Sequence, residues 1–193
     1  MGRKANLILV FFVILFVTSC AGRNFVRPEP ESLILSKTSQ QEIINRFGKP
    51  YQEGTELKNE KTVKTMSYAY ATVGGSPLFE GVTPVRAMGF HFLDETLVGY
   101  EFLSSFKEDN SYFDVDNINK IKKDETSRDQ VIELMGQPSG MYLYPLIKNK
   151  DNKAIVYSYT HSKSYRTYQQ LLVISLDNNG IVTDVSFTSS GQK

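Results

Sequence analysis

A short amphipathic segment that occurs twice in this chain, at residues 38–50 and again at 126–138, most constrains what it can fold into. Equivalent positions in the two copies are 88 residues apart. Each copy opens with Thr-Ser and closes with Gly-x-Pro, and the apolar residues between them follow the i, i+1, i+4 spacing of a helix. A repeated local unit predicts that the chain is built from two copies of one small module.

Each copy carries the signals that start and stop one short helix. The serine can cap the N-terminus, and a Glu or Gln three residues later completes a capping box. The glycine supplies the left-handed residue that ends a helix, and the proline prevents its continuation. These motif residues are Ser39, Gly48 and Pro50 in the first copy and Ser127, Gly136 and Pro138 in the second.

Residues 1–19 have the pattern of a secretory signal peptide. A basic Gly2-Arg3-Lys4 start precedes an apolar run from position 5 to 17 that is interrupted only by Asn6. This run is shorter than the roughly 20 apolar residues that a membrane-spanning helix needs. The sequence therefore predicts a cleaved leader instead of a permanent membrane span.

The end of the leader, Val17-Thr18-Ser19-Cys20, resembles the lipobox of bacterial lipoproteins. The resemblance implies that Cys20 receives a diacylglyceryl group and becomes an acylated N-terminus, for example with palmitate. Ala21, where an aspartate would suggest retention in the inner membrane, implies an anchor in the outer membrane that faces the periplasm. The alternatives are a thiol left inside an ordinary signal peptide or a free buried cysteine. Cys20 is the only cysteine, so the chain can form no disulfide with itself.

The mature chain should begin with a lipidated tether, residues 20–32, because Gly22, Pro28 and Pro30 interrupt it. Loss of Arg3 and Lys4 with the leader reduces the 22 basic residues to 20, against 21 acidic ones. This near-neutral balance gives no electrostatic footprint for nucleic acid. The expected partners are therefore the membrane, through Cys20, and another protein of the envelope.

Alternating polar and apolar residues predict three strands after each helix. We expect an α+β fold of two tandem modules, each a short helical layer packed on an antiparallel meander, at residues 33–105 and 118–190, with a linker at 106–117. Residues 51–61 are polar and should contain a turn around Gly54. The expected strands are 63–70, 86–93 and 97–104 in the first module and 154–160, 170–176 and 181–188 in the second.

The cap, short helix, Gly-x-Pro and meander together resemble the outer-membrane lipoprotein family that includes BamE, also called SmpA or OmlA. A tandem of two such units is similar to the architecture of the beta-lactamase inhibitor protein. The resemblance implies a non-enzymatic role, in which one face of the sheet binds a protein or the membrane near the barrel-assembly machinery. The alternative is an inhibitor-like regulator that clamps a periplasmic enzyme with its paired sheets.

Aromatic residues on or beside the expected strands are candidates for partner binding, because tyrosine offers a large apolar area with a polar tip. The alternative is that these rings belong to the core, since tyrosine favours strands in any case. The long connection at residues 71–85 is either a second binding element or a loop without a task. The candidates are Tyr68, Tyr70, Phe79, Tyr157, Tyr159, Tyr165 and Tyr168.

Catalytic and metal-binding patterns are weak. The two histidines, His91 and His161, have no Cys, Asp or Glu at metal-ligand spacing, and no glycine-rich phosphate loop is present. We therefore expect no metal, no cofactor and no enzymatic activity. A weaker third hypothesis is an envelope enzyme that uses His91 or His161.

Overall fold

A computed structural model describes residues 22–163 and 166–191 of the chain. Eight strands and two α-helices dominate it, with two short 3-10 helices, η1 (Pro30–Ser32) and η2 (Val115–Lys120). The α-helices are α1 (Gln40–Phe47) and α2 (Arg128–Met135). The strands are β1 (Gln52–Lys58), β2 (Lys61–Ala71), β3 (Val85–Leu93), β4 (Thr96–Ser104), β5 (Gly140–Tyr142), β6 (Lys153–Lys163), β7 (Arg166–Leu176) and β8 (Val182–Gly191).

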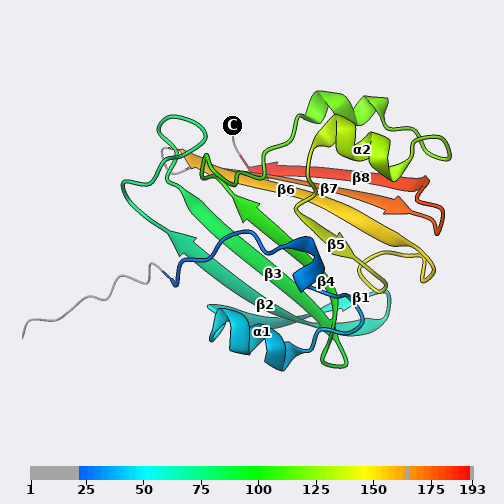
Figure 1. Ribbon diagram of the computed structural model, residues 1–193, viewed down its shortest axis with the longest axis horizontal. Coiled ribbons are helices and arrows are strands. Elements are labelled where there is room, and N and C mark those ends of the chain that lie inside the picture. The colour runs from blue at the N-terminus through cyan, green and yellow to red at the C-terminus, as the bar shows by residue number, and fades with distance from the viewer. Residues whose placement is uncertain (1–21, 164–165, 192–193) are drawn as a thin grey trace, which may run out of the picture.

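All eight strands form one antiparallel sheet, in which each strand lies beside its neighbour in sequence (Figure 1). The prediction of two separate helix-plus-meander modules is therefore wrong. The reason is β5, which follows the second helix and pairs with β4 on one side and with β6 on the other. Three residues of backbone are enough to join the two halves of the chain into a single sheet.

The sequence also failed to predict β1, which includes Gly54, the expected position of a turn. This strand is one edge of the sheet. All of its residues, even Leu57, are exposed except Glu56, which is half-buried. A strand without a buried face carries no alternation of polar and apolar residues. The turn instead lies between β1 and β2, where Asn59 and Glu60 have positive φ angles.

Both helices of the repeat are present with the predicted capping boxes. The amide of Ser39 donates to the Glu42 carboxylate over 2.7 Å, and the amide of Ser127 donates to the Gln130 side chain over 2.8 Å. Gly48 ends α1 with a positive φ of 84°. Isolated backbone bridges also join Ser39 to Thr96 at the start of β4 and Ser127 to Ile181 just before β8, so the start of each helix is held to the sheet of its own half.

The strand register places both helices on the same face of the sheet. Residues that pair across strands share a face, and Glu101 pairs with Gly89 and Gly140, and Gly140 with Val156. The alternate residues on the other face form the apolar clusters beneath the two helices. These two clusters contain Ile43, Met66, Phe90 and Phe102 in the first half and Val131, Ile155, Leu172 and Ile174 in the second.

The opposite face, which we call the helix-free face, is covered only in part. The connection from β5 to β6 folds back over it and buries Ile147 against Ala154 and Val156. Asn59, in the turn after β1, donates to the carbonyls of Pro145 and Ile147 and holds this connection in place. The rest of the helix-free face has no helix over it among the described residues.

The segment predicted to be a tether instead packs against the sheet, crossing the strands of the first half (Figure 1). We call its described part, residues 22–33, the strap. The Phe25 ring contacts Phe102 of β4 edge-on at 6.5 Å, and the Arg27 guanidinium lies over the same ring. Leu33, at the end of the strap, is buried in the first apolar cluster. The sequence did not predict these contacts, because scattered charge and proline are typical of an unpacked tether.

The predicted signal peptide, residues 1–19, and the lipidation site Cys20 lie outside the described residues. Within the described ranges, no helix has the length and apolarity to cross a membrane.

Candidate partner-binding surfaces

Two of the predicted partner-binding tyrosines stabilise the helix ends. Tyr68 and Tyr157 are both buried, and their hydroxyls donate to the carbonyls of Gly48 and Gly136 over 2.9 and 3.0 Å. Each tyrosine therefore closes the C-terminus of the helix in its own half. Burial, with a smaller contribution from Glu53, raises the pKa of Tyr68 to about 12.

The other predicted aromatics differ in exposure. Tyr159 is buried, Tyr70 and Tyr168 are half-buried, and Phe79 is 44% exposed. Tyr165 lies outside the described residues. The structure thus brings Phe79 and Tyr159 together, places Tyr157 in the same apolar cluster as Tyr159, and places Tyr68 in the cluster of the first half.

Alternation along a strand separates two faces but does not say which one a helix will cover. The tyrosines at positions 68, 157 and 159 fall on the helix side, where they pack as core residues. The helix-free face carries mainly short residues instead. For these three positions the structure favours the core alternative over an exposed aromatic patch.

A histidine between two glutamates lies on the helix-free face. The His91 ring on β3 has Nδ1 3.1 Å from Glu56 of β1 and Nε2 2.9 Å from Glu101 of β4. Tyr142 of β5 donates its hydroxyl to the same Glu101 carboxylate over 2.8 Å. One cluster of four side chains thus connects four strands across the junction between the two halves.

The two carboxylates of the cluster favour the protonated form of His91. Burial acts to lower the pKa of His91, but the charges and hydrogen bonds of Glu101 and then of Glu56 outweigh it, so the pKa is raised. With a carboxylate facing each ring nitrogen, both nitrogens can donate only as an imidazolium. The arrangement is an ion-pair lock and leaves neither nitrogen facing open solvent.

Next to this cluster the helix-free face is hollowed. A shallow cavity of about 260 Å³ lies over β4 to β8, with Glu101 and Tyr142 at one side. Its remaining wall is formed largely by hydroxyl and amide side chains from β6, β7 and β8, namely Ser158, Thr160, Gln169, Thr188 and Ser190. Such a surface offers hydrogen-bond donors and acceptors to a partner without a large apolar area.

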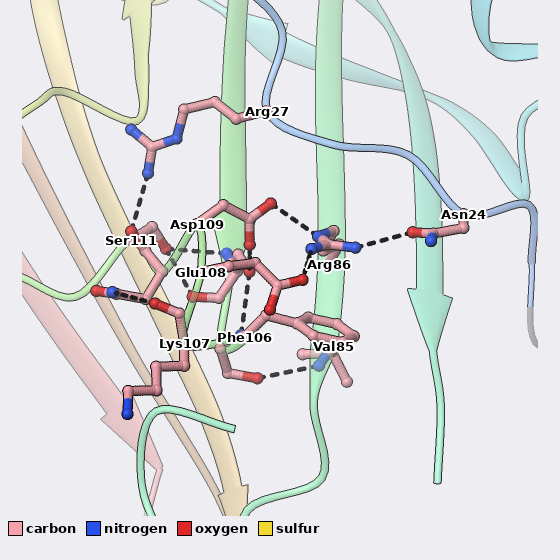
Figure 2. Close-up of polar contacts among 12 residues, drawn as sticks. Asn24, Arg27, Val85, Arg86, Phe106, Lys107, Glu108, Asp109 and Ser111 are labelled. Atoms are coloured by element: carbon pink, nitrogen blue, oxygen red, sulfur yellow. Dashed lines mark hydrogen bonds and ion pairs between the residues drawn. The ribbon is translucent and has the colours of Figure 1, made fainter. Parts of the chain in front are cut away.

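On the helix side, a buried arginine fastens the strap to β3, together with residues 105–114 between β4 and η2, which we call the interhalf segment (Figure 2). Arg86 is 3% exposed and pairs with Asp109 over 2.8 Å and with Glu108 over 2.7 Å. Its third nitrogen donates to Asn24 of the strap over 2.9 Å. The guanidinium also lies over the Phe106 ring at 4.1 Å, so the residues expected to form a linker are instead part of the folded structure.

The connection between β2 and β3, predicted as a possible binding loop, is anchored at its centre. The amide of Leu78 donates to Ser105, and the amide of Lys107 donates to Ser76. Phe79 then packs edge-on against Tyr112 at 5.5 Å, and both rings lie on the buried Tyr159. Val73, near the start of the connection, is 99% exposed.

Among the described residues, no group of three or more His, Cys, Asp or Glu side chains is placed to hold a metal ion. His161 lies on β6, but its side chain is outside the described part. Of the two predicted catalytic candidates, only His91 has its side chain within the described part, and a carboxylate faces each nitrogen of its ring. Sequence spacing could not indicate this cluster, because its members come from four strands.

Comparison with known proteins gives one structural likeness. No protein-family model matches the sequence, and a search of curated proteins also found no match. The fold is similar to that of a Streptococcus mutans protein provisionally named a beta-lactamase inhibitor protein, with 15% identity and a TM-score of 0.40. The alignment covers 78% of this chain and 82% of that one. The resemblance to the BamE family stays a prediction from the sequence.

Proposed function

We propose that this protein is a lipoprotein of the outer membrane that binds another envelope protein without catalysing a reaction. Cys20 would carry the lipid, and the helix-free face of the sheet would carry the partner. The role is that of a scaffold in envelope assembly, facing the periplasm.

The observation that supports this proposal most is the placement of both helices on one face of an eight-stranded sheet. A sheet covered on one side presents its other side as a wide surface held rigid by the core behind it. The connection after β5 covers only part of this surface, and the polar cavity beside Glu101 lies in the remainder. Weak or regulated protein partners commonly use polar surfaces of this kind.

The sequence pattern around Cys20 supports the membrane anchor. A basic start, a short apolar run and a single cysteine at its end are the features that lipid attachment requires. Two or more acyl chains anchor a protein stably, whereas one chain binds only marginally.

Crosslinking in native membranes, followed by identification of the captured proteins, tests the proposal. We expect barrel-assembly subunits to be recovered with the wild-type protein and to be lost with Cys20→Ala, because that variant has no anchor. Thr188→Arg, on the wall of the cavity, should reduce recovery. Gln41→Arg, an exposed change on the far side in α1, is the matched control and should not.

Two outcomes would contradict the proposal. Equal recovery with Thr188→Arg and with Gln41→Arg would exclude the helix-free face as the binding surface. Recovery of a single periplasmic enzyme, whose activity falls on binding, would replace the scaffold by the inhibitor-like regulator.

A further inference from the structure

We propose that the outer edge of β8, at residues 183–187, binds an extended segment of a partner protein with the pattern small, apolar, aromatic. The chain already binds such a segment once, because Gly140-Met141-Tyr142 occupies the matching edge of β4. This inference rests on the proposed protein-binding function and names the edge and the kind of segment that fits it.

β8 is the structural counterpart of β4. In the first half, Leu97 donates its amide to Thr38, which precedes α1, and in the second half Val182 donates to Thr126, which precedes α2. Both hydrogen bonds measure 2.9 Å. Val182 therefore corresponds to Leu97, at an offset of 85 positions.

A bulge at the same place supports this correspondence. The pairing between β3 and β4 is regular except where Val98 has no partner, directly after Leu97. The pairing between β7 and β8 skips Thr183, directly after Val182. Beyond the bulge both strands continue without a further shift in register.

The outer edge of β4 shows which backbone groups form hydrogen bonds with the added strand. Leu143 donates its amide to the Val98 carbonyl over 2.8 Å, and Phe102 donates its amide to the Ser139 carbonyl over 2.9 Å. Tyr100 lies between them, opposite Met141. By the same offset of 85, the Thr183 carbonyl, the Val185 backbone and the Phe187 amide point outward from β8.

Within residues 22–163 and 166–191, no strand pairs with this outer side of β8, which ends the sheet. Edge strands are commonly protected from pairing by charge, by proline or by short length. β1, the other edge, carries Glu53, Glu56 and Lys58. β8 is ten residues long, has no proline and holds a single charge, Asp184, so it lacks such protection.

The segment bound to β4 indicates what the partner must resemble. A Cβ on Gly140 would come within 1.9 Å of the Tyr100 carbonyl, so only a residue without a side chain fits there. Met141 packs against the apolar cluster beneath α1. On β8 the corresponding apolar support is Val185, which packs against the second cluster, with Phe187 exposed beside it.

A second copy of this chain does not fit the same edge. The counterpart of β5 is β1, because both follow the repeated helix at the same spacing of 88 residues. β1 has Gln52 where β5 has Gly140, and Glu53 where β5 has Met141. The glutamine side chain would clash with the neighbouring backbone, and the glutamate would place a charge against apolar residues. β5 of a second copy is already paired on both sides, and its β8 has no glycine within residues 182–190, so the occupant is a segment of a different protein.

A peptide with the sequence of residues 137–143, Gln-Pro-Ser-Gly-Met-Tyr-Leu, is the probe. It would be added to the ¹⁵N-labelled mature chain carrying Cys20→Ala. We expect saturable shifts of the Val185 and Phe187 amides, with binding about tenfold weaker for the matched peptide in which glutamine replaces the glycine. Shifts confined to β4 or to the helix-free face, or no shift at millimolar peptide, would overturn the proposal.

Proline substitutions test the edge from the side of the protein. Val185→Pro removes an outward amide, and proline is tolerated on edge strands where the amide faces solvent. We expect the peptide to lose binding, while the thermal unfolding midpoint shows that the fold persists. Phe187→Pro is the second variant in case the first unfolds. If a folded variant still binds the peptide, the proposal that the edge of β8 is the binding site is refuted. If that variant still captures an envelope partner, the proposed function stands without the β8 edge.

Discussion

The substitution Arg86→Met tests whether the buried ion-pair cluster of Figure 2 holds the strap and the interhalf segment on the sheet. It removes three charge-assisted hydrogen bonds, to Asp109, Glu108 and Asn24, of 2.7 to 2.9 Å. Asp109, only 15% exposed, then loses its salt bridge, and only the more distant charge of Arg27 still acts on it. Removing one partner of a buried pair costs about 3–5 kcal/mol, chiefly because the other charge stays buried, so we expect that loss in the free energy of unfolding.

Two further variants separate the sources of this loss. Glu108→Gln should cost less than about 1 kcal/mol, because the Glu108 side chain is 61% exposed and its pair is screened by water. Adding Asp109→Asn to Arg86→Met should recover about 1–2 kcal/mol, because the uncompensated charge is then gone.

Urea denaturation followed by circular dichroism measures these differences, provided the slope of free energy against urea is the same for all variants. A cost below about 1 kcal/mol for Arg86→Met would refute the reasoning. So would a double variant less stable than Arg86→Met alone, because the cost would then come from packing and not from the stranded charge.

Three other predictions can be measured in the same way. The pKa of His91 is raised on folding, so protonated His91 adds to the free energy of unfolding. This stabilisation is complete below about pH 6.5 and is lost as the pH rises through the raised folded-state pKa. His91→Gln should remove this pH dependence. Ser39→Ala and Ser127→Ala should each cost about 1 kcal/mol, and a cost near zero would mean that the capping boxes do not hold the helices. Gly140→Ala should cost about 2 kcal/mol or more, because its Cβ would meet the β4 backbone, and an unchanged midpoint would contradict the close approach.

The sequence predicts local structure well where the signal lies within a few residues. The serine caps and Gly-x-Pro endings locate both helices, and alternation locates the strands that have one buried face. It does not predict how the halves join, because β5 is three residues long and exists only through its two neighbours.

The candidate site is harder to predict, for a physical reason. Strand alternation groups residues 68, 157 and 159 on one face, but which face a helix covers depends on the register of distant strands. The His91 cluster is likewise assembled from β1, β3, β4 and β5, so no spacing in the chain indicates it. Arg86 gave no signal either, since its partners are 22 and 23 residues away in a segment with the composition of a linker.

The docked strap determines how far the proposed lipoprotein can reach. Gly22 already lies against the backbone of Ala69, where a Cβ would come within 1.9 Å of the carbonyl. Two peptide links from Cys20 to Gly22 span at most about 7 Å. The sheet would therefore stand at the membrane surface with the first half nearest the lipid. A partner of the first half would therefore bind close to the lipid headgroups.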